Sequence, residues 1–190
     1  MTTHEDKFKG VTIGVYKEDG DRLIKDMKKH IKGEVVFFCV GTDRSTGDSF
    51  APYVGSMLEE KGYKNVIGTI DDPAHAINLE ERMKQIPEGV TVVAIDASLG
   101  KQNSVGSLQL ISGALYAGAG VGKDLPPVGD YQIQGIVNVN SGSKGMNQLV
   151  LQATRFKVVM HLAKQLVAAI EEVYPIHNET INNAYITAVK

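Results

Sequence analysis

Two short apolar runs that end in polar residues constrain the fold of this chain more than any other feature. The first, VVFFCV at residues 35–40, leads into the turn-rich stretch GTDRSTGDS. The second, VTVVAI at residues 90–95, ends at Asp96. Continuous apolar runs of this length indicate strands that are buried on both faces. Such strands need helices on both sides of the sheet, so they predict an α/β fold.

The segments around these runs show helical periodicity. We expect helices over residues 21–31 and 49–61, ended by Gly33 and Gly62, with Asp48 as the N-cap of the second. Residues 64–70 are expected to form a strand, and a short helix follows with apolar positions at 79, 83 and 86. Residues 8–17 alternate in part, which predicts an edge strand or an ordered arm.

The second half of the chain departs from this alternation of helix and strand. Residues 104–111 and 131–139 are both typical of strands, and only a segment rich in Gly, Ala and Pro separates them. Two strands without a helix between them predict an antiparallel pair. One long helix is expected over residues 147–173, followed by a polar tail from Pro175.

These elements predict a single three-layer α/β/α domain over residues 1–190, with a mostly parallel, partly mixed central sheet. Its core is expected at about residues 34–174, with a peripheral N-terminal arm and C-terminal tail. The chain has 20 basic and 22 acidic residues and no basic block, which argues against a nucleic-acid partner. Cys39, the single cysteine, is predicted to be a buried core thiol. No apolar run is long enough for a membrane span, so we expect no membrane partner and a cytoplasmic location.

Two acidic residues follow the apolar runs, and they are the strongest candidates for chemistry. Because loops at the carboxyl ends of parallel strands meet at one edge of a sheet, Asp48 and Asp96 are expected to face each other. Two neighbouring carboxyl groups can share a proton, so that one activates water while the other polarises an amide; they can also hold a divalent metal. The structural alternatives are a helix cap for Asp48 and an Asx-turn for Asp96. Asp43 lies nearer the strand end, and spacing does not decide between Asp43 and Asp48.

Other residues near the acids are predicted to bind substrate: Asp43, Arg44, Ser98, Gly118, Gly120 and Gly122. The three glycines belong to a loop expected to lie over the mouth of the sheet. This loop lacks the G-x-x-x-x-G-K-[ST] and G-x-G-x-x-G patterns of phosphate-binding loops. No G-x-S-x-G elbow is present either, and there is no histidine between His75 and His161. The leading interpretation therefore includes no cofactor and no metal site.

Three motifs together resemble a known family. GTDRSTGDSFAP at 41–52, VVAIDAS at 92–98 and the glycine-rich segment from residue 113 resemble the YyaC-like sporulation proteins. These are similar to the spore germination protease, an aspartic-type enzyme, and more distantly to hydrogenase maturation endopeptidases. The two catalytic aspartates of the germination protease match Asp48 and Asp96 by motif.

The resemblance implies a sporulation-associated aspartic-type peptidase in the cytoplasm of a sporulating cell or spore. Its substrate would be a protein or peptide, with small acid-soluble spore proteins as candidates. Two alternatives stay open: a non-catalytic sporulation protein that uses the same cleft for binding or assembly, and a metal-assisted maturation peptidase. Assembly as a homo-oligomer also stays open.

Overall fold

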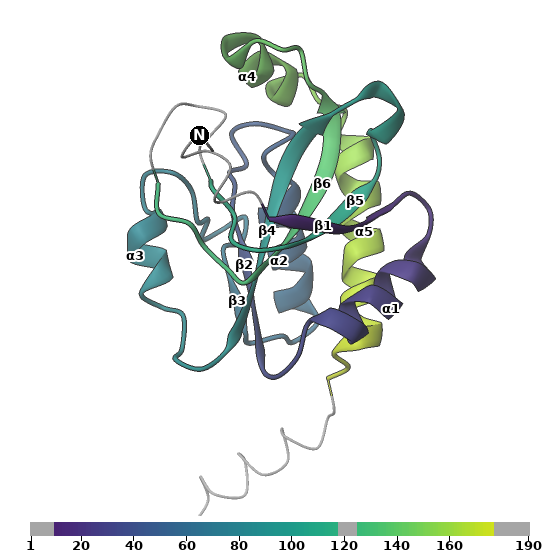
Figure 1. Cartoon of the computed structure of the whole chain (residues 1–190). Coiled ribbons are helices and arrows are strands. Elements are labelled where there is room, and N and C mark those ends of the chain that lie inside the picture. Colours follow the sequence, from purple (N-terminus) through teal and green to yellow (C-terminus); the bar gives the residue numbers. More distant parts are fainter. Residues whose placement is uncertain (1–9, 118–124, 177–190) are drawn as a thin grey trace, which may run out of the picture.

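The computed structural model describes residues 10–117 and 125–176, and its centre is one six-stranded sheet in the order β1-β5-β6-β4-β2-β3 (Figure 1). Strands β6, β4, β2 and β3 run parallel, whereas β5 is antiparallel to both β6 and β1. The predicted α/β fold with a mixed sheet is therefore confirmed. The strands are β1 Val11–Tyr16, β2 Val35–Cys39, β3 Val66–Ile67, β4 Thr91–Gly100, β5 Leu108–Ser112 and β6 Tyr131–Val139.

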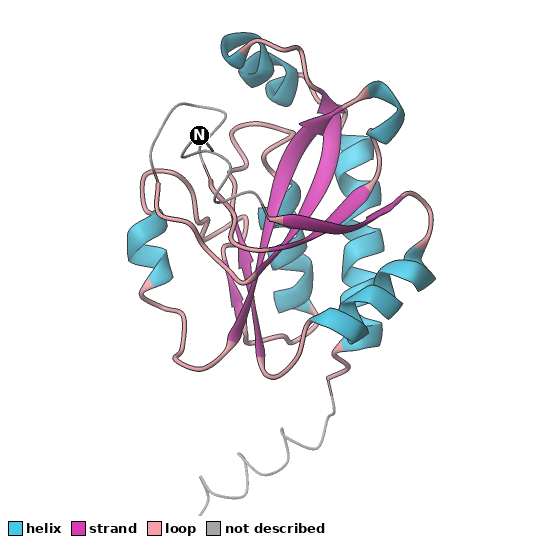
Figure 2. Ribbon diagram, in the orientation of Figure 1, coloured by secondary structure: helices cyan, strands magenta, loops and turns pink. Residues whose placement is uncertain are grey.

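Helices cover the two faces of the sheet unequally. On one face lie α1 (Gly20–His30), α2 (Phe50–Glu60) and α5 (Phe156–Val173), and their apolar sides build the larger core with the sheet. The opposite face carries the short helix α3 (Leu79–Met83) and the chain segments around Leu115 and Val128 (Figure 2). Helices thus lie on both faces as predicted, but the third layer is thin.

The continuous apolar run of β2 is explained by these two cores. All five residues of the strand are buried, and side chains alternate between the faces. Phe37 and Cys39 point into the larger core, while Phe38 and the following Val40 point into the smaller one. Burial raises the pKa of the Cys39 thiol far above its ordinary value, so Cys39 is the inert core thiol expected from the sequence.

Two predicted strands have different bounds, and one predicted helix cap is wrong. The expected strand over 64–70 is reduced to Val66–Ile67, since the chain turns at Gly68. The expected strand over 104–111 begins only at Leu108, after a 3₁₀ turn at Gln102–Ser104. The helix after β2 begins at Phe50, and Ser49 rather than Asp48 precedes it, without a capping hydrogen bond from its side chain.

The expected long helix over 147–173 is in fact two helices, α4 (Lys144–Gln152) and α5. At the break, the buried Thr154 hydroxyl donates to the carbonyl of Val150 at 2.9 Å and accepts from the Asn138 amide at 3.2 Å. The amide of Gly47 donates to the carbonyl of Leu151 at 2.9 Å. These bonds join the end of α4 to β6 and to the loop after β2. Neither Gly nor Pro marks the break, so sequence periodicity did not reveal it.

Close packing of α2 on the sheet gives a first prediction, for Gly55. A Cβ added at Gly55 would lie 2.1 Å from the carbonyl oxygen of Gly68, so α2 would have to move away from the sheet. We expect Gly55→Ala to lower the free energy of unfolding by about 2 kcal/mol in urea titrations. The control is Gly145→Ala in α4, where a Cβ meets nothing within 4 Å and no loss is expected. Equal stability of the two variants would contradict this packing.

Candidate functional site: an acid pair at the end of the sheet

The sheet has a topological switch point between β2 and β4. From β2 the chain passes through α2 to β3 on one side, whereas β4 lies on the other side of β2 and pairs with β6. Loops that leave such neighbouring strands part in opposite directions and leave a crevice at the carboxyl ends. Residues 41–48 and the second half of β4 meet at this point.

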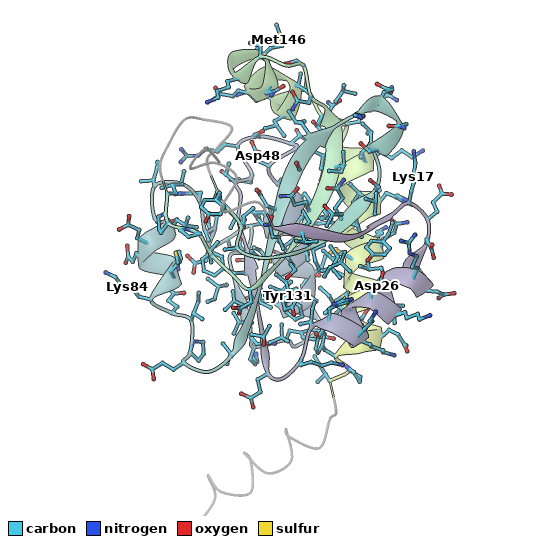
Figure 3. All side chains as sticks on the ribbon, in the orientation of Figure 1. Lys17, Asp26, Asp48, Lys84, Tyr131 and Met146 are labelled. Carbon is cyan, nitrogen blue, oxygen red and sulfur yellow. The ribbon has the colours of Figure 1, made fainter. Side chains whose placement is uncertain are left out.

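The loop after β2 is held in a closed shape. The amide of Thr42 donates to the carbonyl of Asp48 at 3.2 Å, and Gly47 is bound to Leu151 of α4. Gly41 allows this closure, because a Cβ there would lie 2.1 Å from the carbonyl oxygen of Asp48. The loop therefore brings Asp48 back to the end of β2, beside the upper part of the sheet (Figure 3).

Asp48 and Asp96 lie near enough for their charges to repel. Burial first, and the charge of Asp48 second, raise the pKa of Asp96 to about 8, although the Ala97 amide donates to its Oδ1 at 2.8 Å. Burial also raises the pKa of Asp48. Asp96 is half-buried as a residue, but protein atoms surround its carboxyl group. One proton is thus retained in the pair at neutral pH.

Both structural alternatives for the two acids are wrong. Asp48 does not cap α2, because Ser49 precedes the helix. Asp96 does not close its strand, since β4 continues to Gly100. The choice between Asp43 and Asp48 is also decided: Asp43 is exposed, and it is the charge of Asp48 that acts on Asp96.

The predicted substrate-binding residues do not all lie beside the acid pair in the described structure. Asp43 and Arg44 are exposed in the loop, where the Thr42 hydroxyl lies 3.5 Å from Asp43 Oδ1 and 3.3 Å from the Arg44 amide. Ser98 lies on the same strand and face as Asp96, two residues further along β4. Gly118, Gly120 and Gly122 lie outside the described residues.

Ser45 is a neighbour of the acid pair that sequence analysis did not select. Its side chain is buried, and its hydroxyl lowers the pKa of Asp48, though by less than burial raises it. Among the described residues this hydroxyl has no hydrogen bond of ordinary geometry. It is therefore available to orient the Asp48 carboxyl group or a bound water. The turn-rich loop pointed to this region, but nothing in the sequence distinguished Ser45 from the other serines near the acids.

Two glutamines of β6 also border the site. Gln134 is aligned with Asp96 across the parallel pair, so the two side chains share a face. The Gln134 amide donates to Gln132 at 2.9 Å, and Gln132, which is buried, donates to the carbonyl of Ala114 at 2.8 Å. This chain of amides ties the segment before residue 118 to the sheet beside Asp96. Glutamine has no spacing signature, so the sequence did not indicate it.

Other potential sites lie away from the acids. Among the described residues, a hollow of about 360 Å³ lies beside α3, and another of about 360 Å³ lies near Gly33 and Tyr174 at the opposite end of the sheet. Neither includes Asp48 or Asp96. Within residues 10–117 and 125–176, no three or more His, Cys, Asp or Glu side chains are grouped to hold a metal ion. No helix of this part of the chain has the length and apolar character required to cross a membrane.

The fold and the site define a class: α/β proteins with a buried pair of carboxyl groups at the switch point of a mixed sheet. The chain belongs to the family described as "Protein of unknown function (DUF1256)", which matches residues 15–169. It is similar to the Bacillus subtilis (strain 168) protein named "Uncharacterized protein YyaC". The two are 45% identical over 149 residues, which cover 76% of this chain and 71% of the relative. The expected membership in the YyaC-like family is therefore confirmed.

Proposed function

We propose that this protein is an aspartic-type peptidase in which Asp48 and Asp96 share one proton. The observation that carries the proposal is the raised pKa of Asp96, about 8, caused by burial and by the neighbouring Asp48. At neutral pH the pair then holds one acid and one base side by side, as hydrolysis by two carboxyl groups requires. The motif resemblance to the spore germination protease supports the same chemistry.

In the proposed reaction, ionised Asp48 takes a proton from a water molecule, and the water oxygen attacks the amide carbon. Asp96 donates its proton to the carbonyl oxygen, which gives a neutral tetrahedral intermediate. The C–N bond then breaks, the amine leaves with the proton held by Asp48, and a hydroxyl proton of the intermediate returns to Asp96. The Ser45 hydroxyl orients Asp48. The proton transfers involve only the two carboxyl groups, the water molecule and the substrate amide.

We further propose that the substrate is a protein with an extended segment, and that small acid-soluble spore proteins are the first candidates. The cytoplasm of the sporulating cell or spore is then the place of action. This assignment follows the motif resemblance of residues 41–52 and 92–98 to sporulation proteins.

The test is cleavage of small acid-soluble spore proteins by the purified chain, with and without a chelator, from pH 4 to pH 10. We expect cleavage that the chelator does not affect and that declines above about pH 8, where Asp96 loses its proton. It should also decline at acidic pH, where Asp48 gains one. Loss of cleavage on chelation would favour metal-assisted hydrolysis. Folded protein without cleavage at any pH would favour a binding or assembly protein.

A further inference from the structure

Strand β4 is longer than the neighbour that covers its edge. β2 pairs with β4 from Val35 to Cys39, opposite Thr91 to Ile95, and the amide of Val40 makes the last bond, to the carbonyl of Ile95. β4 then continues through residues 96–100, paired with β6 alone. Figure 1 shows β4 and β6 running together toward α4. Within residues 10–117 and 125–176, no strand therefore covers this edge of β4 at the acid pair.

The direction of each backbone group on this edge follows from the ladder. Backbone groups of successive strand residues point alternately to the two neighbouring strands. The carbonyl of Val92 bonds on the β6 side and that of Ile95 on the β2 side, so odd-numbered residues point to β2. Ala97 and Leu99 accordingly point to the position where β2 would continue.

Among the described residues, these groups have no backbone partner. The Ala97 amide donates to the side chain of Asp96, its own neighbour. The Ala97 carbonyl and both backbone groups of Leu99 make no hydrogen bond within residues 10–117 and 125–176. Unpaired groups of this kind on a sheet edge are a template for another strand.

In the part of the chain that the structure describes, the strand position next to this edge is open. After Val40 the amide of Gly41 donates to the carbonyl of Ala74 at 2.8 Å, and the loop then closes through the bond from Thr42 to Asp48. Residues 41–48 make no backbone hydrogen bond to β4 among the described residues. The vacant position thus lies between a closed loop that carries Asp48 and a free edge that begins next to Asp96.

We propose that an extended polypeptide docks as an added strand on the free edge of β4, at Ala97 and Leu99. A main chain is the matching occupant, because its amide and carbonyl groups have the spacing of the unpaired groups on this edge. The polypeptide enters the position that β2 vacates and passes its backbone in front of the acid pair. Its identification as substrate rests on the proposed peptidase function, whereas docking on the edge does not require cleavage.

Amide hydrogen exchange measured by NMR tests the docking directly. The probes are β-casein, which is an unfolded polypeptide, and a small acid-soluble spore protein, added to the Asp96→Asn chain so that neither is consumed. We expect exchange of the Leu99 amide to slow when either probe binds. The Ser98 amide, which points to β6, is the internal control and should not change. Unchanged exchange at Leu99 with bound probe, or no binding of either probe, would overturn the proposal.

A matched pair of variants provides a second test. Leu99→Pro removes the amide on the free edge, and Leu99→Ala removes the same side-chain packing but keeps the amide. We expect the proline variant to bind both probes at least about tenfold more weakly than the alanine variant. Equal binding and equal cleavage by the two variants would overturn docking on the β4 edge but leave the proposed peptidase function in place. Binding at the edge without any cleavage by the parent chain would support docking and overturn the peptidase function.

Discussion

Asp48→Asn and Asp96→Asn are each expected to lower the rate of peptide cleavage about a thousandfold. Asparagine keeps the size of the side chain but can neither accept the proton of water nor donate one to the carbonyl oxygen. Because the two carboxyl groups act as one unit, the double variant should be no slower than either single variant by more than a small factor. Initial rates on a small acid-soluble spore protein at pH 7 measure this.

The matched control is Asp43→Asn. Asp43 lies in the same loop as Asp48 but is exposed, and the charge that raises the pKa of Asp96 is that of Asp48. We expect this variant to keep the parent kcat within about twofold, since it leaves both members of the acid pair in place; a change confined to KM would fit the substrate-binding role predicted for Asp43. A thousandfold loss in Asp43→Asn together with full activity in Asp48→Asn would show that Asp43, not Asp48, is the catalytic acid of this loop.

The second large effect concerns stability, because a buried acid with a raised pKa opposes folding when it ionises. The pKa of Asp96 is about 8 in the folded protein, against an ordinary value of 3.8. Below pH 4 Asp96 is protonated in both states and costs nothing. Between pH 4 and pH 8 the unfolded chain releases its proton first, so stability falls as the pH rises. Above pH 8 the loss is complete.

Asp96→Asn removes this pH dependence because the amide does not ionise. We expect the variant and the parent to have similar free energies of unfolding at pH 4. At pH 9 the variant should be more stable by on the order of 5 kcal/mol. Urea titrations at the two pH values measure the difference, with Asp43→Asn as the control that should follow the parent. A constant difference between Asp96→Asn and the parent across this range would contradict a raised pKa.

The two expected effects have one physical origin. The surroundings that hold a proton on Asp96 at neutral pH are those that make its ionised form unfavourable. A variant that gains stability at alkaline pH while it loses cleavage would therefore link the cost in folding to the function of the pair. A gain in stability without any cleavage in the parent would instead favour a binding protein that retains the acids.

The sequence by itself determined the elements whose signals are local. The strand predicted over 131–139 is β6 with the same bounds, and the apolar run at 35–40 is β2 with the bridge at Val40. The helix expected over 21–31 agrees with α1 to within a residue at each end. Each depends on a repeat of two or 3.6 residues, or on burial on both faces, and such a repeat is readable from neighbouring positions. The sequence also selected Asp48 and Asp96 as the candidate acids.

Only the tertiary structure decided which groups meet. The break between α4 and α5 depends on contacts of Thr154 and Leu151 with β6 and the distant Gly47, and it has no local marker. The place of Asp48, rather than Asp43, beside Asp96 depends on how the loop closes. The free edge of β4 exists because β2 ends while its neighbour continues, and strand lengths are set by pairing between segments far apart in the chain. Hydrogen bonds and contacts over such separations leave no periodic signal, so they could be found only in the folded molecule.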